Sequence, residues 1–136
     1  MKYANLTHLV IGIMVLILFV LTGQYMHHRY DHLIGMPDIE RALFRAGHIY
    51  ILFSSLIHLV LGSYLNISTK PLKRMTQGMG SLLLVAATIL IIFSFFYELP
   101  TNQIERSYSR YGIYLTLAGV LLHAIPEKKL SLFNRD

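Results

Sequence analysis

Long stretches without a charged residue constrain this chain more than any other feature. Three of them, of 26, 24 and 23 residues, cover positions 3–28, 46–69 and 75–97, and a fourth of 16 residues covers 111–126. A helix needs about 20 predominantly apolar residues to cross the hydrocarbon core of a bilayer. Because the stretches consist largely of Leu, Ile, Val and Phe, the sequence predicts helices that span a membrane.

We expect four spans, near residues 5–27, 43–66, 76–97 and 108–125. The first segment lacks the short apolar core and small-residue cleavage site of a signal peptide, so we expect it to be retained. The connections are short, which places neighbouring helices antiparallel. The expected fold is therefore all-α: an integral membrane protein with four transmembrane helices in one up-down bundle, forming a single domain over 1–136.

The distribution of charge predicts the orientation of these helices. The N-terminus, the 67–75 loop and the C-terminal tail together carry seven basic and two acidic residues, whereas the opposite side carries five of each. Basic residues favour the cytoplasmic side of a membrane. Both termini are thus expected in the cytoplasm and the 28–42 loop in the periplasm of a bacterium. The net charge of +5 then reflects contact with anionic lipid headgroups rather than with nucleic acid.

Three histidines are predicted to cluster inside the cytoplasmic third of the bundle. They are His8, His58 and His123, on the first, second and fourth spans. Neutral imidazole binds transition metals, and two imidazoles on facing helices can ligate haem iron. We therefore treat these residues as a candidate site for haem b or a transition metal. The alternative is that they hydrogen-bond to neighbouring helices or reach the headgroups.

A second candidate site lies in the loop sequence MHHRYDHLIGMPDIE. If the first helix continues into it, His28, Asp31 and His32 lie at i, i+3 and i+4 on one face. Two histidines and a carboxylate suit zinc, copper or iron, and His48 or Glu98 could add a ligand. The absence of cysteine excludes disulfides, thiolate catalysis and cysteine-based metal sites. The alternative is a polar connector at the membrane surface.

Two family resemblances bear on function. The start of the second span, RALFRAGHIYILFSSLIHL, is superficially similar to the membrane-associated eicosanoid and glutathione metabolism family, but it lacks the Asn and Glu that complete that family's glutathione site. The segments RAGHIYIL, FFYELP and RYGIYLTLAGVLLH resemble uncharacterised small four-helix bacterial inner-membrane proteins. The second resemblance covers about a third of the chain. It implies the topology and a bacterial membrane, and it implies no activity.

Three functions remain open at this point. The first is a non-catalytic accessory, assembly or structural subunit, which packs against itself as a homo-oligomer or against a larger membrane complex. The second is a haem- or metal-binding membrane protein with a redox or metal-handling role. The third is an enzyme acting on a lipid or quinone, which predicts a lipid-sized cleft that reaches His48 or His58.

Overall fold

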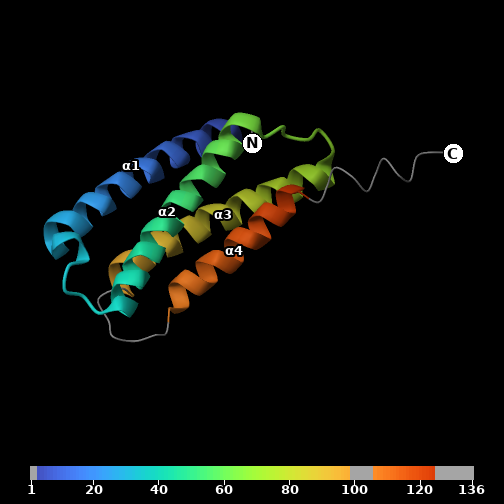
Figure 1. The fold of residues 1–136 in the computed structure, drawn as a ribbon. Coiled ribbons are helices and arrows are strands. Elements are labelled where there is room, and N and C mark those ends of the chain that lie inside the picture. Colours follow the sequence, from blue (N-terminus) through green and yellow to red (C-terminus); the bar gives the residue numbers. More distant parts are fainter. Residues whose placement is uncertain (1–2, 99–105, 125–136) are drawn as a thin grey trace.

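The computed structural model of this chain describes residues 3–98 and 106–124, and within them helices are joined by short connections and no strand is present. The all-α prediction is therefore confirmed for this part of the chain. The elements are α1 (Ala4–Tyr30), a short 3₁₀ turn η1 (Asp31–Leu33), α2 (Asp38–Tyr64), α3 (Pro71–Tyr97) and α4 (Ser107–Ala124) (Figure 1).

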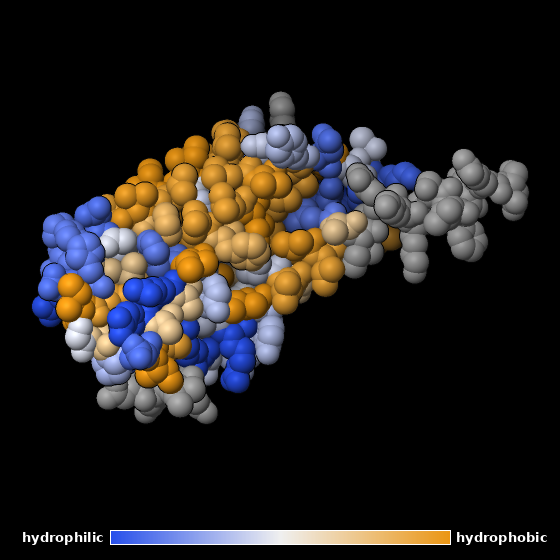
Figure 2. Space-filling view, viewed as in Figure 1, coloured by the Kyte–Doolittle hydropathy of each residue, from blue (hydrophilic) through white to orange (hydrophobic). Residues whose placement is uncertain are grey.

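Three of the described helical segments are long and apolar enough to cross a membrane. They are Ala4–Leu33, Asp38–Tyr64 and Pro71–Tyr97. Figure 2 shows hydrophobic side chains covering the middle of the molecule, with hydrophilic ones gathered toward its ends. A surface of this kind is expensive in water and matches the hydrocarbon of a bilayer. The structure therefore agrees with a multi-pass membrane protein.

The helices form two hairpins. α1 packs along α2, and α3 packs along α4, whereas α2 and α3 meet less extensively. The start of α1, the connection between α2 and α3 and the end of α4 lie at one end of the bundle (Figure 1). We call this the histidine end, because His8, His58 and His123 lie toward it.

Close approach at glycines holds the first hairpin together. A Cβ atom built on Gly62 would lie 2.6 Å from the backbone nitrogen of Leu9, and one on Gly12 would lie 2.8 Å from the backbone nitrogen of Leu59. The Ser55 hydroxyl also donates a hydrogen bond of 2.8 Å to the Gly12 carbonyl oxygen. Helices in lipid associate through such small residues and polar contacts, since lipid supplies no hydrophobic drive between them.

The second hairpin is packed in the same way. A Cβ on Gly119 would lie 3.0 Å from the Gly80 carbonyl oxygen and 2.7 Å from Cγ of Leu84. Gly112 is equally tight against Ile91, at 2.8 Å from its Cγ1. Both hairpins are therefore built on backbone contacts that a larger side chain would disrupt.

Two helices begin before the membrane spans expected from the sequence. α2 begins at Asp38 rather than near 43, and α3 begins at Pro71 rather than near 76. Proline suits the first position of a helix, where its missing N–H group leaves nothing unpaired. The ends of the uncharged stretches therefore mark where the apolar part stops, while the helices continue with charged residues that lie beyond it.

Replacing Gly62 by alanine should destabilise the first hairpin by about 1–3 kcal/mol, because the new Cβ meets the backbone of α1. Gly23→Ala is the matched control: its Cβ would meet only His48, at an ordinary 3.4 Å, and alanine favours helix. Unfolding in detergent followed by circular dichroism measures both. Equal stability of the two variants would contradict this packing.

Candidate functional site

His8 of α1 and His58 of α2 form a buried pair in the first hairpin. Their side chains are 2% and 1% exposed, and their Nδ1 atoms lie 2.7 Å apart. The ring centroids are 4.9 Å apart in a stacked arrangement. A neutral imidazole carries one N–H group, so one Nδ1 donates its proton to the other. The structure thus brings together two of the three histidines predicted to cluster.

His58 also contacts the second hairpin through Thr88 of α3. Its Nε2 lies 2.9 Å from the Thr88 hydroxyl oxygen, which the Ser54 hydroxyl also contacts at 2.6 Å. Thr88 in turn donates a hydrogen bond of 2.9 Å to the Leu84 carbonyl oxygen one turn earlier. All of these contacts are buried. Because a buried polar group without a partner is costly, they fix α2 against α3 at this level.

The third predicted histidine joins the pair through Ser81 of α3. The Ser81 hydroxyl lies 2.9 Å from Nε2 of His8 and 3.3 Å from Nε2 of His123. A single set of hydrogen bonds therefore connects all four helices. We call it the histidine network, and it consists of His8, Ser54, His58, Ser81, Thr88 and His123.

The sequence interpretation missed Ser81 and Thr88, although a signal for them exists. They lie seven residues apart, which is close to two full turns, so they occupy one face of α3. Ser54 lies one turn before His58 in α2, but its hydroxyl contacts Thr88 rather than His58. The partners of His58 come from two other helices, which spacing along one helix does not reveal.

A groove between α1 and α3 reaches the histidine network. It consists of two hollows that share Val85, one of about 410 Å³ and one of about 400 Å³. His8, Ser81 and Thr7 line the first, toward the histidine end. The second has an almost wholly apolar lining, with Thr88 as its polar member. We call the two hollows together the α1–α3 groove.

The network is not spaced for a haem between two of its histidines. Two imidazoles on opposite sides of one metal ion have nitrogens about 4 Å apart, since each bond is about 2 Å. His8 and His58 instead contact each other directly, and Ser81 lies between His8 and His123. The residues in this arrangement do not fit a haem. No observation tests whether these three histidines bind haem b or a transition metal in another arrangement, so that binding stays a prediction from the sequence.

At the other end of the bundle, the residues of the second candidate site do not share one helix face. α1 ends at Tyr30, and Asp31 and His32 adopt positive φ angles of 42° and 55°. The turn brings Nδ1 of His32 within 3.2 Å of Nδ1 of His27, and the rings of His27 and His28 are adjacent. The helical register on which the predicted i, i+3, i+4 set depends is therefore lost.

His48, the fourth predicted metal ligand, is engaged between α1 and α2. Its Nδ1 lies 3.0 Å from the Thr22 hydroxyl, and its ring stacks on Phe19 at 4.1 Å between centroids. Across residues 3–98 and 106–124, no group of three or more histidine or acidic side chains is placed to hold a metal ion. The predicted metal site of His28, Asp31, His32 and His48 is therefore not confirmed.

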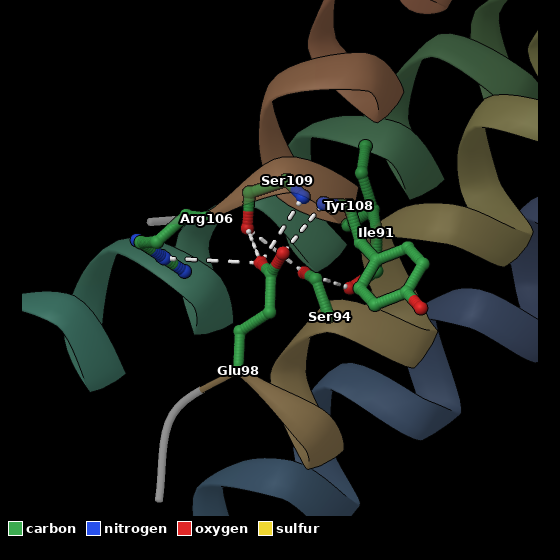
Figure 3. A network of polar contacts seen from close by, with 6 residues as sticks. All are labelled: Ile91, Ser94, Glu98, Arg106, Tyr108 and Ser109. Carbon is green, nitrogen blue, oxygen red and sulfur yellow. Dashed lines mark hydrogen bonds and ion pairs between the residues drawn. The ribbon is translucent and has the colours of Figure 1, made fainter. Parts of the chain in front are cut away.

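Glu98, the other ligand considered for that site, joins the end of α3 to the start of α4 (Figure 3). Its carboxylate accepts hydrogen bonds from the backbone N–H groups of Tyr108 and Ser109 and one of 2.7 Å from the Ser109 hydroxyl. Arg106 lies 4.0 Å away, and the hydroxyl oxygens of Ser109 and Ser94 lie 3.0 Å apart. A carboxylate is favoured at the positive end of a helix, so Glu98 acts as a cap for α4.

Comparison with known proteins identifies no relative of this chain. No family model, no curated protein and no solved structure matches it. The resemblance to small bacterial inner-membrane proteins therefore stays an expectation from the sequence.

Replacing Thr88 by valine keeps the side-chain shape but leaves His58 Nε2 and the Ser54 hydroxyl without their shared partner. We expect a loss of about 1–3 kcal/mol in the free energy of unfolding. Thr116→Val is the matched control, because Thr116 is equally buried and its hydroxyl donates within its own helix, to Gly112. Unfolding in mixed detergent micelles compares the two. A larger loss at Thr116 would contradict the central place of Thr88.

Proposed function

We propose that this chain is a non-catalytic accessory protein of a bacterial inner membrane that holds a lipid-soluble amphiphile, of the lipid or quinone class, in the α1–α3 groove. The observation that carries the proposal is a groove with an apolar lining that ends at a buried, hydrogen-bonded histidine, His8. Its function would be to supply or retain that molecule for a second copy or a larger complex.

Four membrane crossings with cytoplasmic termini are part of this proposal. α4 has 18 residues, which corresponds to about 27 Å of helix, close to the thickness of about 30 Å of the hydrocarbon core. It also packs closely along α3, which is itself long and apolar enough to cross. The excess of basic residues on the side that carries the termini supports the orientation.

The size of the groove suits such a ligand. Pockets for small molecules commonly span about 300–1,000 Å³, and each of the two hollows, at about 410 and 400 Å³, falls within that range. Both are largely apolar, so an alkyl or prenyl tail can lie along Val15, Leu18 and Val85. Neither His48 nor His58 lines the hollows, but His8 and Thr88 do, and both of these contact His58.

The polar end of the groove suits a head group. His8 lies about one turn from the start of α1, so a head at this position stays near the membrane surface while its tail points inward. Thr7 and Ser81 offer hydroxyl oxygens there, and a hydroxyl oxygen has two lone pairs. A head with a hydroxyl group can therefore donate a hydrogen bond to them without breaking the contact between His8 and His58.

Filling the groove tests this proposal. Val85→Phe places a larger side chain where the two hollows meet, so labelling by a photoactivatable alkyl quinone or fatty acid in liposomes should fall about tenfold. Val20→Phe is the matched control, because Val20 is exposed and lines neither hollow. Peptide mapping should place the label of the unaltered protein on α1 and α3. Equal labelling of both variants would rule the proposal out.

A further inference from the structure

Three exposed histidines meet at the end of the bundle opposite the histidine end. His27 and His28 belong to the last turn of α1, and His32 belongs to the turn η1 that follows it. The ring centroids of His27 and His32 lie 3.9 Å apart, and those of His27 and His28 lie 4.6 Å apart. All three side chains are exposed, so dissolved ions can reach them.

The spacing of two of these rings matches one edge of a tetrahedral metal site. The Nδ1 atoms of His27 and His32 lie 3.2 Å apart. In a tetrahedral zinc site with bonds of about 2.0 Å, two ligand nitrogens are about 3.3 Å apart. Neighbouring nitrogens of a square-planar copper(II) site with bonds of the same length would be closer, at about 2.8 Å. The spacing therefore favours zinc. We call these two side chains the His27–His32 pair.

The pair needs only a small change to bind an ion. Neutral imidazole carries one N–H group, so one of the two Nδ1 atoms donates its proton to the other. If the donating ring moves that proton to its Nε2 through the surrounding water, both Nδ1 atoms present a lone pair. The two rings already meet through these nitrogens, so neither has to turn around to share an ion.

The backbone holds the pair in place without a metal. Asp31, His32 and Leu33 adopt positive φ angles of 42°, 55° and 66°, which residues other than glycine rarely do. Leu33 anchors this turn, because it is 4% exposed and packs in the apolar cluster. Backbone strain of this kind persists where the surroundings impose it, and it is frequent at functional sites. The turn brings His32 back to His27, so little ordering is needed on binding.

The surroundings of the pair do not repel a cation. The side of the molecule that carries it has five basic and five acidic residues, whereas the histidine end has seven basic and two acidic ones. Within residues 3–98 and 106–124, no group of three or more histidine or acidic side chains is placed around an ion. Two positions of a tetrahedral site here are therefore left for water.

We infer that the His27–His32 pair binds one zinc ion through its two Nδ1 atoms, with water in the other two positions. Zinc sites with positions open to water differ from the closed four-ligand sites that are purely structural. The ion would tie the end of α1 to the turn η1 in place of the present hydrogen bond. The site lies outside the α1–α3 groove and does not depend on the function proposed for it.

Single substitutions test which histidines hold the ion. The full chain without an affinity tag, in phospholipid nanodiscs, is titrated with zinc chloride in competition with a chromophoric chelator. His27→Asn and His32→Asn should each lower the zinc affinity about tenfold or more, because losing even an outer partner of a ligand costs about 10–100-fold. His28→Asn is the matched control and should bind as the unaltered chain does. An equal loss in all three variants, or no loss in the first two, would overturn the inference.

Spectroscopy of the zinc complex identifies the ligand atoms. X-ray absorption at the zinc edge should show two imidazole nitrogens at about 2.0 Å. In the chain labelled with ¹⁵N-histidine, the Nδ1 signals of His27 and His32 should shift on addition of zinc, whereas those of the buried His8 and His58 should not. Zinc surrounded by oxygen alone, or bound through the histidine network, would refute the site.

The anchored turn gives a further test that leaves both ligands in place. Leu33→Ala removes the buried side chain that fixes η1, so zinc affinity should fall about tenfold because the pair must then be ordered as the ion binds. Ile34→Ala is the control, since Ile34 is 71% exposed. Equal affinity of the two variants would contradict a site prepared by the turn. Val85→Phe should not alter zinc binding, so this inference and the proposed function fail separately.

Discussion

Hydrogen bonds between the two hairpins are the interaction on which the histidine end of the bundle depends. In lipid, apolar surfaces gain little by meeting each other, so helices need close backbone contact or polar side chains to associate specifically. Within each hairpin, the glycines supply the close backbone contact. Between the hairpins, the hydrogen bonds that join His8 to Ser81 and His58 to Thr88 supply the polar contacts. These contacts lie beside the α1–α3 groove, because His8, Ser81 and Thr88 line it.

The two ends of the bundle are held together by different kinds of side-chain contact. Away from the histidine end, Phe44 and Phe95 meet edge to face at 6.1 Å in an apolar cluster, and Glu98 caps α4. Packing and capping hold the helices together at that end. At the histidine end, the buried polar side chains form one network across all four helices, and this network adjoins the α1–α3 groove. This contrast is the reason for placing the lipid-soluble amphiphile at the histidine end.

The sequence predicts much of this arrangement, because membrane spans impose simple rules. Uncharged stretches predict three helices that the structure shows to be long and apolar enough to cross, and the depth of each span correctly groups His8, His58 and His123. The partners Ser81 and Thr88 could not be chosen, since pairing depends on how the hairpins rotate against each other. The backbone conformation of the loop between α1 and α2 was harder to predict than these contacts. Three successive residues from Asp31 to Leu33 adopt positive φ angles, and Leu33 packs in the apolar cluster, a tertiary contact that the loop sequence alone does not reveal.

Helices that follow one another in the sequence pack together, and this affects how the bundle assembles during synthesis. Each hairpin joins helices that follow one another, so α1 and α2 can associate before α3 leaves the ribosome. At that stage His58 has His8 beside it, but its second nitrogen faces lipid, where an unpaired polar group is unfavourable. The arrival of Thr88 relieves that cost. The same hydrogen bond that orders the finished bundle would thereby favour α3 over an apolar helix that has no hydroxyl group at this depth.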